Sequence, residues 1–249
     1  MNDVSPDLRR ALRSLRLGKL LPVLPERLRI ARERKQDPED LLLTLFTDEI
    51  ERRNQQRHAR RAKAAGLLPS LVFDEWDRTA NVSIDVALLD ELRTLRFIDA
   101  HHHALIVGPV GVGKTMLAHA LGHLAVLRDI GVICLTADKL LHTLRASRLD
   151  GTYERELRRF CDVDLLIVDD LGLRMMDARE STDLYEIVCA RHRKRSMIVS
   201  SNREPAEWLT VLADPLHGQA LVDRFTNNAY DLIVEGESYR KRQKPTHSE

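Results

Sequence analysis

The residues that could do chemistry begin with Gly108 to Thr115, GPVGVGKT, which fit the phosphate-binding pattern GxxxxGK(S/T) without a mismatch. Three glycines let the backbone turn tightly, so that successive N–H groups can point at phosphate oxygens. In this pattern Lys114 reaches the terminal phosphates and the Thr115 hydroxyl holds Mg²⁺. The predicted phosphate site comprises Gly108, Pro109, Val110, Gly111, Val112, Gly113, Lys114, Thr115 and Met116.

The flanking sequence supplies the elements that must position this loop. The apolar run 104–107 predicts a short buried strand before the loop, and residues 115–127 have the composition of a helix behind it. The start of that helix adds the positive end of its dipole to the pocket. A glycine loop that merely turns a strand into a helix is the alternative, but a complete motif in this context favours a phosphate site.

Two acids follow another candidate strand. Residues 165–168, LLIV, are apolar and end in Asp169 and Asp170. An acid at the carboxyl end of a buried parallel strand is where nucleotide-binding sheets place a carboxylate that holds Mg²⁺. We expect Asp169 to position Mg²⁺, directly or through water, and Asp170 to orient or deprotonate the attacking water. The alternative is a strand followed by an acidic turn.

A further strand is predicted at 132–136, between the phosphate loop and the acids. That order resembles the ATPases that use a second acid to activate water, rather than small nucleotide kinases. The strand predicted at 196–201 ends in Asn202, which could contact the γ-phosphate and the attacking water. A helix predicted at 220–229 carries Arg224, for which the sequence alone leaves a surface salt bridge with Asp223 and contact with a nucleotide phosphate about equally open.

Length, charge and cysteine content limit the class of protein. The chain of 249 residues can hold one domain of ordinary size plus an appendage. Residues 1–68 contain 16 Lys and Arg against 10 Asp and Glu, whereas the remainder contains 23 against 28, which indicates a basic arm on a nearly neutral or acidic domain. Cys134, Cys161 and Cys189 are predicted to be reduced core residues. No apolar run is long enough to cross a bilayer and the N-terminus lacks a signal-peptide core, so we expect a cytoplasmic protein with no membrane partner.

The N-terminal segment is predicted to be helical. Apolar residues from Leu8 onward recur at helical spacing, and Gly18 interrupts them, so two short helices are expected. Asp37 then has the character of an N-cap and Pro38 of a first helical residue, which predicts a helix to about residue 65 that Gly66 ends. Its second half carries Arg52, Arg53, Arg57, Arg60, Arg61 and Lys63. A solvated helix face is the ordinary interpretation of such a run, and contact with the phosphate backbone of nucleic acid is the functional one.

The remaining segments connect these parts. Residues 67–83 are predicted to be a linker that docks on the following domain through Phe73 and Trp76, and residues 84–97 to be helical. The three histidines at 101–103 are predicted to be a polar lead-in to the strand, because they cannot all reach one metal ion from it. More helices are expected at 138–148, 153–161 and 179–194, and a last strand at 230–234.

Five motifs in this order carry a resemblance to a known family: GPVGVGKT, LLIVDD, SSN, VDRF and GESYR. The chain resembles the AAA+ ATPases of the IstB/DnaC type, and among them IstB, the ATP-binding helper of an insertion-sequence transposase. The sequences SSNREPAEW and GESYR and the basic helical N-terminal segment favour IstB. The resemblance implies an α/β fold, namely a P-loop AAA+ three-layer αβα parallel sheet after a small all-α N-terminal domain, without a C-terminal helical lid. The expected domains are a helical basic domain at 1–68, an ATPase domain at 69–240 and a basic, polar tail at 241–249.

The resemblance also implies roles for single residues. The phosphate loop would bind ATP, Asp169 and Asp170 would be the Walker B pair, and Asn202 would be sensor one. Arg224 would be the arginine finger, which in this family acts on ATP bound by the neighbouring subunit. An arginine suits that task because its fixed fork of donors neutralises charge on the transferring phosphoryl group.

The sequence departs from the family pattern at two places. Asp170 stands where AAA+ ATPases generally carry Glu, and its shorter side chain predicts slow hydrolysis that DNA would stimulate. Only 15 residues, 235–249, follow the last predicted strand, which is too few for a helical lid. We therefore expect Arg240 to contact the phosphates or a neighbouring subunit from the tail.

Three functions follow, in order of expectation. The first is an ATP-dependent helper that forms a homo-oligomer on duplex DNA, with ATP at the subunit interfaces, and recruits or activates a cognate transposase for transposition, a form of DNA recombination. The second is a loader for a replicative helicase, which binding of the N-terminal segment to a helicase would distinguish. The third is a P-loop kinase for a small molecule, against which the intervening strand and the lack of a substrate lid count.

Overall fold

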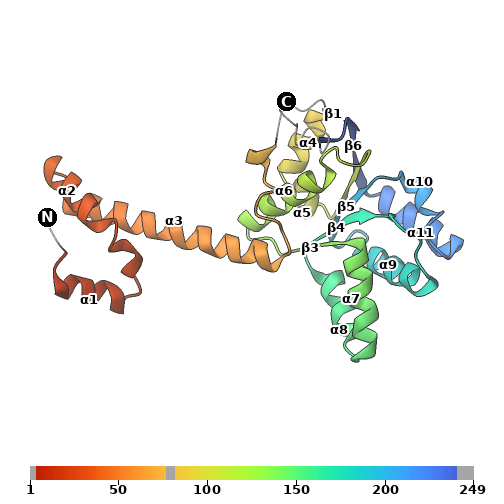
Figure 1. Ribbon diagram of the computed structural model, residues 1–249, viewed down its shortest axis with the longest axis horizontal. Helices are drawn as coiled ribbons and strands as arrows, with labels where there is room; N and C mark the ends of the chain where they lie inside the picture. Colours follow the sequence, from red (N-terminus) through yellow and green to blue (C-terminus); the bar gives the residue numbers. More distant parts are fainter. Residues whose placement is uncertain (1–3, 77–81, 240–249) are drawn as a thin grey trace, which may run out of the picture. The chain divides into compact units, whose positions relative to one another are not determined.

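The computed structural model describes residues 4–76 and 82–239 and divides into two compact units, residues 1–60 and 61–249 (Figure 1). The first unit is entirely helical. Its elements are α1 (Pro6–Ser14), the 3₁₀ helix η1 (Gly18–Leu20), α2 (Leu24–Glu33) and the greater part of α3 (Pro38–Ala64). Among the described residues, no helix is both long and apolar enough to span a membrane.

Capping side chains mark the starts of two N-terminal helices, of which only the Asp37 cap was predicted. The Ser5 hydroxyl accepts from the backbone N–H of Leu8 at 3.3 Å at the start of α1, and the Asp37 carboxylate accepts from the Glu39 N–H at 2.8 Å at the start of α3. α3 ends one residue before the predicted limit, and Gly66 follows it with φ 85°, a conformation that favours glycine. The prediction of two short helices and one long one is confirmed.

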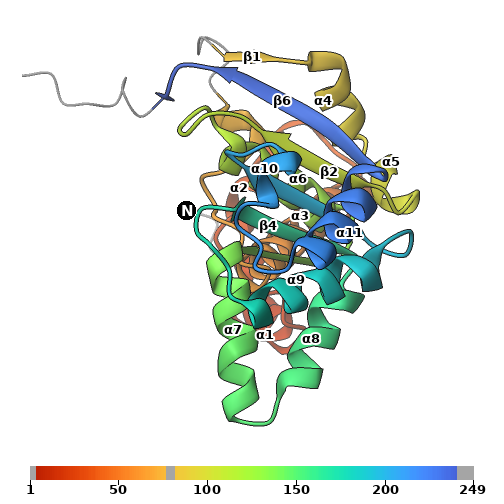
Figure 2. The same cartoon turned by 90° about the vertical axis from the view of Figure 1, so that its right-hand side faces the viewer.

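The second unit is built on a six-stranded sheet with the order β1-β6-β2-β5-β4-β3. Strands β2 to β6 are parallel, and β1 joins β6 antiparallel at the edge, as Figure 2 shows, so the sheet is mixed rather than fully parallel. The strands are β1 (Val82–Ile84), β2 (His103–Val107), β3 (Val132–Thr136), β4 (Leu165–Leu171), β5 (Ser196–Ser201) and β6 (Ala229–Gly236).

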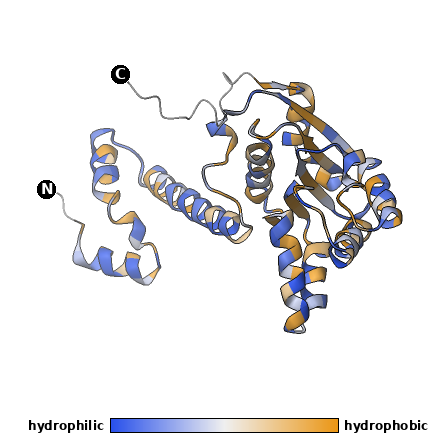
Figure 3. Cartoon of the chain, turned by 45° about the vertical axis from the view of Figure 1, so that its right-hand side comes forward, coloured by the Kyte–Doolittle hydropathy of each residue, from blue (hydrophilic) through white to orange (hydrophobic). Residues whose placement is uncertain are grey.

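Helices cover both faces of this sheet and give three layers, because neighbouring residues of each buried strand alternate between the faces. Ile167 of β4 lies in a core with α6, α4 and α5, whereas Leu166 and Val168 lie in a core with α7, α8, α9 and α11. Hydrophobic residues accordingly run through the centre of the unit in Figure 3. The helices are η2 (Phe73–Glu75), α4 (Val86–Arg93), α5 (Arg96–Asp99), α6 (Lys114–Leu127), α7 (Ala137–Leu149), α8 (Tyr153–Asp162), α9 (Ala178–Arg191), α10 (Pro205–Trp208) and α11 (Pro215–Thr226).

Two predicted helices were wrong in extent. The helix expected over 84–97 is divided, because Ile84 belongs to β1 and Leu95 adopts a left-handed conformation with φ 61°. The helix expected over 220–229 begins earlier, at Pro215, because Asp214 caps it by accepting from the N–H groups of Leu216 and His217 at 2.8 and 3.2 Å. The short α10 was not expected at all.

His103 was wrongly predicted to be part of a polar lead-in. It is the first residue of β2 and fully buried, with its ring stacked on Phe225 at 5.0 Å between centroids. Its Nδ1 accepts from the Met197 N–H at 3.2 Å, so the ring is neutral. Burial lowers the pKa of His103 to about 3.

Arg191, the last residue of α9, ties several elements together from inside the core. It is fully buried, and burial lowers its pKa to about 10. Its guanidinium donates to the carbonyl oxygens of Phe160 (2.6 Å), Cys161 (3.0 Å), Asp164 (3.3 Å) and Ser196 (2.5 Å). These carbonyls lie at the end of α8 and at the starts of β4 and β5, so one side chain fixes where two central strands begin.

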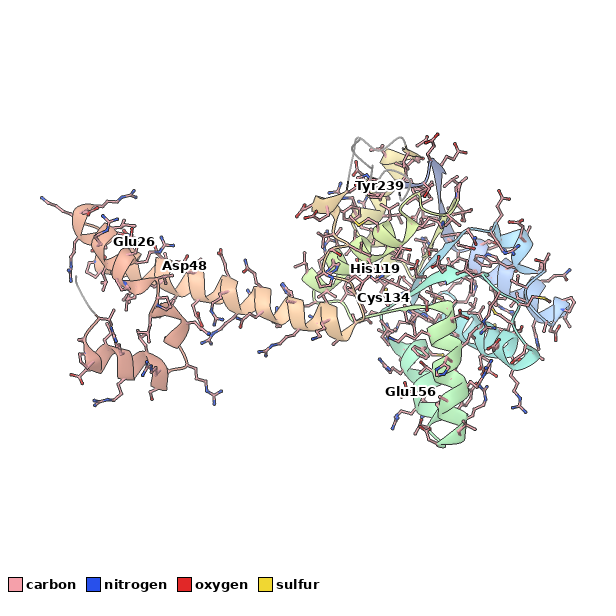
Figure 4. All side chains as sticks on the ribbon, in the orientation of Figure 1. Glu26, Asp48, His119, Cys134, Glu156 and Tyr239 are labelled. Carbon is pink, nitrogen blue, oxygen red and sulfur yellow. The ribbon has the colours of Figure 1, made fainter. Side chains whose placement is uncertain are left out.

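The segment after α3 is fastened to α6 and β3. The Cys134 N–H donates to the Ala65 carbonyl at 2.6 Å, and the Leu68 N–H donates to His119 Nδ1 at 3.1 Å. His119 and Cys134 lie beside each other in Figure 4, with 3.6 Å between Nε2 and Sγ. Burial raises the pKa of the Cys134 thiol to about 12, which keeps it protonated and inert.

Candidate nucleotide-binding site

The phosphate loop lies between the end of β2 and the start of α6, and its backbone requires glycine. Gly111 and Gly113 adopt φ values of 88° and 103°, which disfavour any other residue. A Cβ on Gly108 would overlap the Val234 carbonyl oxygen, and one on Gly113 would lie 2.9 Å from the Trp76 ring. The loop therefore has the bare, left-handed backbone that a phosphate cradle needs.

Lys114 lies at the first turn of α6, directed into the loop. Its side chain is largely buried, and its ammonium group donates to the carbonyl oxygens of Gly108 and Pro109, both at 2.7 Å. A buried ammonium group held by loop carbonyls at a helix N-terminus places positive charge where phosphate oxygens would bind. The geometry fits the terminal-phosphate role that the motif predicts.

Thr115 and Asp169 come together, although 54 positions separate them in the sequence. The Thr115 hydroxyl donates to Asp169 Oδ1 at 3.2 Å, and Asp169 is only 4% exposed. Asp169 faces α6 because it continues the alternation of Leu165 and Ile167 along β4. A hydroxyl and a carboxylate at a phosphate loop form an oxygen donor set that fits Mg²⁺.

Ser200 is a site residue that the sequence did not single out. The hydroxyl of this fully buried β5 residue hydrogen-bonds to Asp169 Oδ1, and it accepts from the Asp170 N–H at 2.9 Å. One side chain thus orients one acid and fixes the backbone of the other. The signal available was weak, because Ser200 is one of three serines in the six residues of β5.

Asp170 follows Asp169 near the end of β4, at an irregular point of the strand. Its backbone is left-handed, with φ 58°, and the pairing of β4 with β5 shifts register between Val168 and Leu171, which marks a bulge. Asp tolerates this conformation better than most residues. Asp170 lines a small pocket with Ala137, Asp138, Leu141, Gly172, Leu173, Arg174 and Met176.

Asn202 follows β5 directly and is exposed. The preceding residue, Ser201, pairs with Val107 of β2, so Asn202 and the phosphate loop leave the sheet at the same edge. The turn is held in place on its other side, where Arg203 Nε donates to the Gly172 carbonyl at 2.8 Å. The structure thus brings Asn202 to the edge that carries Asp169 and the loop.

Two segments distant in sequence also contact the loop. The Tyr239 N–H donates to the Gly111 carbonyl at 2.9 Å, and a Cβ on Gly111 would overlap the Ser238 hydroxyl. On another side, the Trp76 ring borders Gly113. None of these three residues was predicted to be a site residue, although Trp76 was expected to dock on this domain. Arg240 lies outside the described residues.

Arg224 lies near the ends of the strands that are opposite to the phosphate loop. It precedes Phe225, whose ring stacks on His103 at the first position of β2, whereas the phosphate loop follows the last position of that strand. Four steps along a strand span about 13 Å, so Arg224 is remote from the loop of its own chain. The expected alternative, a salt bridge with Asp223, is not seen between these two described residues, and Asp223 instead accepts from Asn227 Nδ2 at 2.6 Å.

At least three of the six cations predicted to contact DNA are paired with carboxylates. Arg52 and Arg53 of α3 both hydrogen-bond to Glu49 at 2.7 Å. The pKa of Glu49 is lowered to about 2, and the hydrogen bond from Arg52 is the largest cause. Arg61 forms an ion pair with Asp129 and donates to the Ile130 carbonyl at 3.0 Å. The remaining three, Arg57, Arg60 and Lys63, are exposed.

Comparison with known proteins agrees with this geometry. Residues 10–247 match the family model described as IstB-like ATP binding protein. An insertion-sequence ATP-binding protein of Mycobacterium tuberculosis is 33% identical over 98% of each chain. The insertion sequence IS21 ATP-binding protein of Pseudomonas aeruginosa is 31% identical over 82% of this chain and 77% of its own length.

Solved structures share the fold of the second unit. The replication initiator DnaA, bound to AMPPCP and single-stranded DNA, superposes with a TM-score of 0.56 at 24% identity and covers 69% of this chain, which spans 51% of that one. The DnaC helicase loader superposes with a TM-score of 0.53 at 18% identity over 67% of this chain and 97% of its own. At such identities the likeness concerns the fold alone. The chain belongs to the family of IstB-like ATP-binding proteins of insertion sequences, and its AAA+ fold is related to those of DnaA and DnaC.

Proposed function

We propose that this protein is a DNA-dependent ATPase that assembles on duplex DNA with ATP between neighbouring copies and recruits or activates the transposase of its insertion sequence. The observation that carries the proposal is the cluster of Lys114, Thr115, Asp169 and Ser200 around a glycine loop, in a chain whose relatives belong to insertion sequences. The cluster is the part that binds nucleotide. The relatives supply the context in which nucleotide binding is used.

Each residue of the cluster has a separate task in hydrolysis. The loop N–H groups and Lys114 hold the phosphates, and Thr115 with Asp169 would hold Mg²⁺. When bound, Mg²⁺ neutralises charge that develops on the phosphate oxygens. Ser200 keeps the Asp169 carboxylate turned toward Thr115. Asn202 orients the attacking water from the same edge of the sheet.

Asp170 accepts the proton of the attacking water or orients that water. Aspartate is shorter than glutamate by one methylene, and Asp170 starts from a left-handed backbone. The shorter side chain holds the attacking water less well than a glutamate would. We therefore propose slow hydrolysis, so that the ATP-bound assembly persists.

Arg224 acts on ATP held by a second copy. Its distance from its own loop supports this proposal, because a finger must lie beside the γ-phosphate that it stabilises. ATP at such an interface is bound by both copies, so it stabilises the assembly by mass action. Hydrolysis would then dissolve the assembly.

DNA contact is proposed from the exposed cations of α3, and it would depend on backbone charge and DNA shape rather than on base reading. Release of phosphate from ATP, measured with and without duplex DNA, tests the activity. We expect release without any acceptor metabolite, faster with duplex, and abolished in Lys114→Ala protein. Phosphate transfer to a small molecule with no stimulation by duplex would contradict the proposal and identify a kinase.

Recruitment of the transposase needs its own measurement. We expect the protein with ATP and duplex to retain the transposase encoded by the same insertion sequence in a pull-down, and to retain it less without ATP. A replicative helicase tested in parallel is the control, because the fold is related to that of the helicase loader DnaC. Retention of the helicase and not of the transposase would contradict the proposed client.

A further inference from the structure

Tyr185 of α9 holds the Arg224 side chain. Arg224 Nη1 donates to the Tyr185 hydroxyl at 3.2 Å, and its guanidinium carbon lies 5.5 Å from the centroid of the Tyr185 ring. A guanidinium at this distance is attracted to the ring face as well as to the hydroxyl. One tyrosine thus interacts with the same cation in two different ways.

Tyr185 is itself fixed by α11. Its ring stacks on His217, with 4.7 Å between centroids and 26° between planes. His217 precedes Arg224 by seven residues, which is about two helical turns, so both side chains lie on the same face of α11. His217 Nδ1 lies 3.1 Å from Asp214, the residue that caps this helix. The tyrosine is therefore held between the first and last turns of α11.

The chemical character of this interaction matters as much as its geometry. Among residues 4–76 and 82–239, the Arg224 guanidinium makes one hydrogen bond, to a neutral phenol, and no ion pair with a carboxylate. An arginine has five N–H donors, so the others remain for an anion. A carboxylate partner would have neutralised the charge, whereas a ring and a hydroxyl orient the guanidinium and leave its charge for another group.

We propose that Tyr185 is a positioning residue, which sets the Arg224 guanidinium in the orientation that engages the triphosphate bound by a neighbouring copy of the chain. The inference rests on the proposed function of Arg224. Tyr185 touches neither the nucleotide of its own chain nor that of the neighbour. It acts by reducing the number of conformations that Arg224 samples before the two copies meet.

The test uses two substitutions of graded effect. Tyr185→Phe keeps the ring and removes the hydroxyl, and we expect kcat for ATP to fall about threefold. Tyr185→Leu removes the ring as well, and we expect a fall of about tenfold or more. ATP affinity, measured by equilibrium binding, should stay unchanged, because the phosphate loop is intact.

A matched control is available within the same unit. Tyr153 of α8 also carries an arginine over its ring, with Arg148 at 4.0 Å, and its hydroxyl donates to Asp183 at 2.8 Å. Tyr153→Phe therefore removes an equivalent hydroxyl without involving Arg224. We expect its kcat to remain at the wild-type value. Melting temperatures of all variants would identify any that fail to fold.

Mixing variants locates the effect in the neighbour. Arg224→Ala protein lacks the finger but keeps its nucleotide site, and Asp170→Asn protein lacks hydrolysis but keeps the finger, so a mixture should recover part of the activity. The Asp170→Asn/Tyr185→Leu double variant should recover about tenfold less in the same mixture. Adding Tyr185→Leu to the Arg224→Ala protein should lower the recovery no further.

The outcomes separate the two proposals. If Arg224→Ala protein hydrolyses ATP at the wild-type rate, the finger and everything built on it are wrong. Suppose that the mixture of Arg224→Ala and Asp170→Asn proteins recovers activity. If the Asp170→Asn/Tyr185→Leu protein, used in place of Asp170→Asn, recovers the same activity, then only the role of Tyr185 is wrong. An equal decrease from Tyr153→Phe would show that the effect of Tyr185→Phe is one of general packing.

Discussion

Asp169 and Asp170 are adjacent in sequence but lie in different surroundings. Asp169 shares its oxygen with Thr115 and Ser200, whereas Asp170 lines a pocket beside Asp138 and Arg174. The bulge and the left-handed backbone at Asp170 separate them. Substitutions of the two acids should therefore have different consequences.

Asp170→Asn should retain ATP binding and abolish hydrolysis, since Asn accepts the same left-handed backbone and cannot take a proton. We expect the rate of phosphate release to fall about a hundredfold or more while the dissociation constant for ATP stays within about twofold. Asp170→Glu, which adds one methylene, should raise the rate above that of the wild type. An unchanged rate in Asp170→Asn protein would remove Asp170 from the mechanism.

His103 predicts a pH dependence of stability. Its pKa is about 3 in the folded chain because of burial, against an ordinary value near 6.5 in the unfolded chain. Between these values the unfolded chain binds one more proton, so stability falls as pH decreases below about 6.5, at about 1.4 kcal/mol per pH unit.

The pH effect is measurable against a variant that does not titrate. His103→Asn keeps a side-chain acceptor for the Met197 N–H and removes the titrating group. Between pH 7.5 and pH 5.0 the free energy of unfolding should decrease by about 2 kcal/mol more in the wild type than in the variant, by urea titration. Parallel decreases in the two proteins would mean that His103 is not the residue responsible.

At the scale of elements, Arg191 links α9 to α8, β4 and β5. Arg191→Met would remove the hydrogen bonds to four carbonyl oxygens, two of them buried, and should lower the free energy of unfolding by about 3 kcal/mol or more. Arg195→Met is the control, because Arg195 is partly exposed and pairs with Asp164 at 3.5 Å. We expect that control to cost less than about 1 kcal/mol in chemical denaturation. Equal costs would contradict the role given to Arg191.

The ion pairs of α3 show which of its cations should be replaced in a DNA-binding experiment. Arg52 and Arg53 are paired with Glu49, and Arg61 with Asp129, so their charges are locally compensated. Replacing the exposed Arg60 and Lys63 by Gln should reduce the slope of log K against log salt by about 0.9 for each DNA phosphate that the protein then fails to neutralise. The same replacement at the exposed Arg158 and Lys194 is a charge-matched control that should leave the slope unchanged. An unchanged slope in the α3 variant would mean that this helix face is solvated and does not contact DNA.

The elements were predictable where local signals were strong. The complete loop motif, the apolar run before Asp169 and the Asp37–Pro38 start of α3 each produced the expected structure. Sequence reasoning failed where tertiary packing decides. It made Ile84 helical because its pairing with β6 is distant in sequence, and it took His103 as polar because the Phe225 ring that covers it lies 122 positions later.

The candidate site was also predictable only where a sequence motif marks its residues. Lys114, Thr115 and Asp169 lie where their motifs indicate, whereas Ser200, Trp76 and Tyr239 reach the loop only through folding. A short polar residue within a strand, or an aromatic residue in a linker, has many ordinary explanations. Tyr185 could not have been linked to Arg224, because 39 positions separate them and they lie on different helices.

At the scale of the whole molecule, the arrangement predicts that one chain is incomplete as an ATPase. The phosphate loop and Arg224 lie at opposite ends of β2, so the proposed role of Arg224 requires a second copy of the chain. Hydrolysis should therefore rise more steeply than linearly with protein concentration, until assembly is complete. A specific activity that is constant from the most dilute sample upward would indicate that each chain works alone.

The most direct test is the mass of the protein in solution, measured by analytical ultracentrifugation with and without ATP, Mg²⁺ and duplex DNA. We expect a small species without ATP and a large complex with all three present, which Lys114→Ala protein cannot form. A wild-type protein that keeps one and the same mass under every condition, at concentrations where ATP is bound, would contradict assembly through ATP.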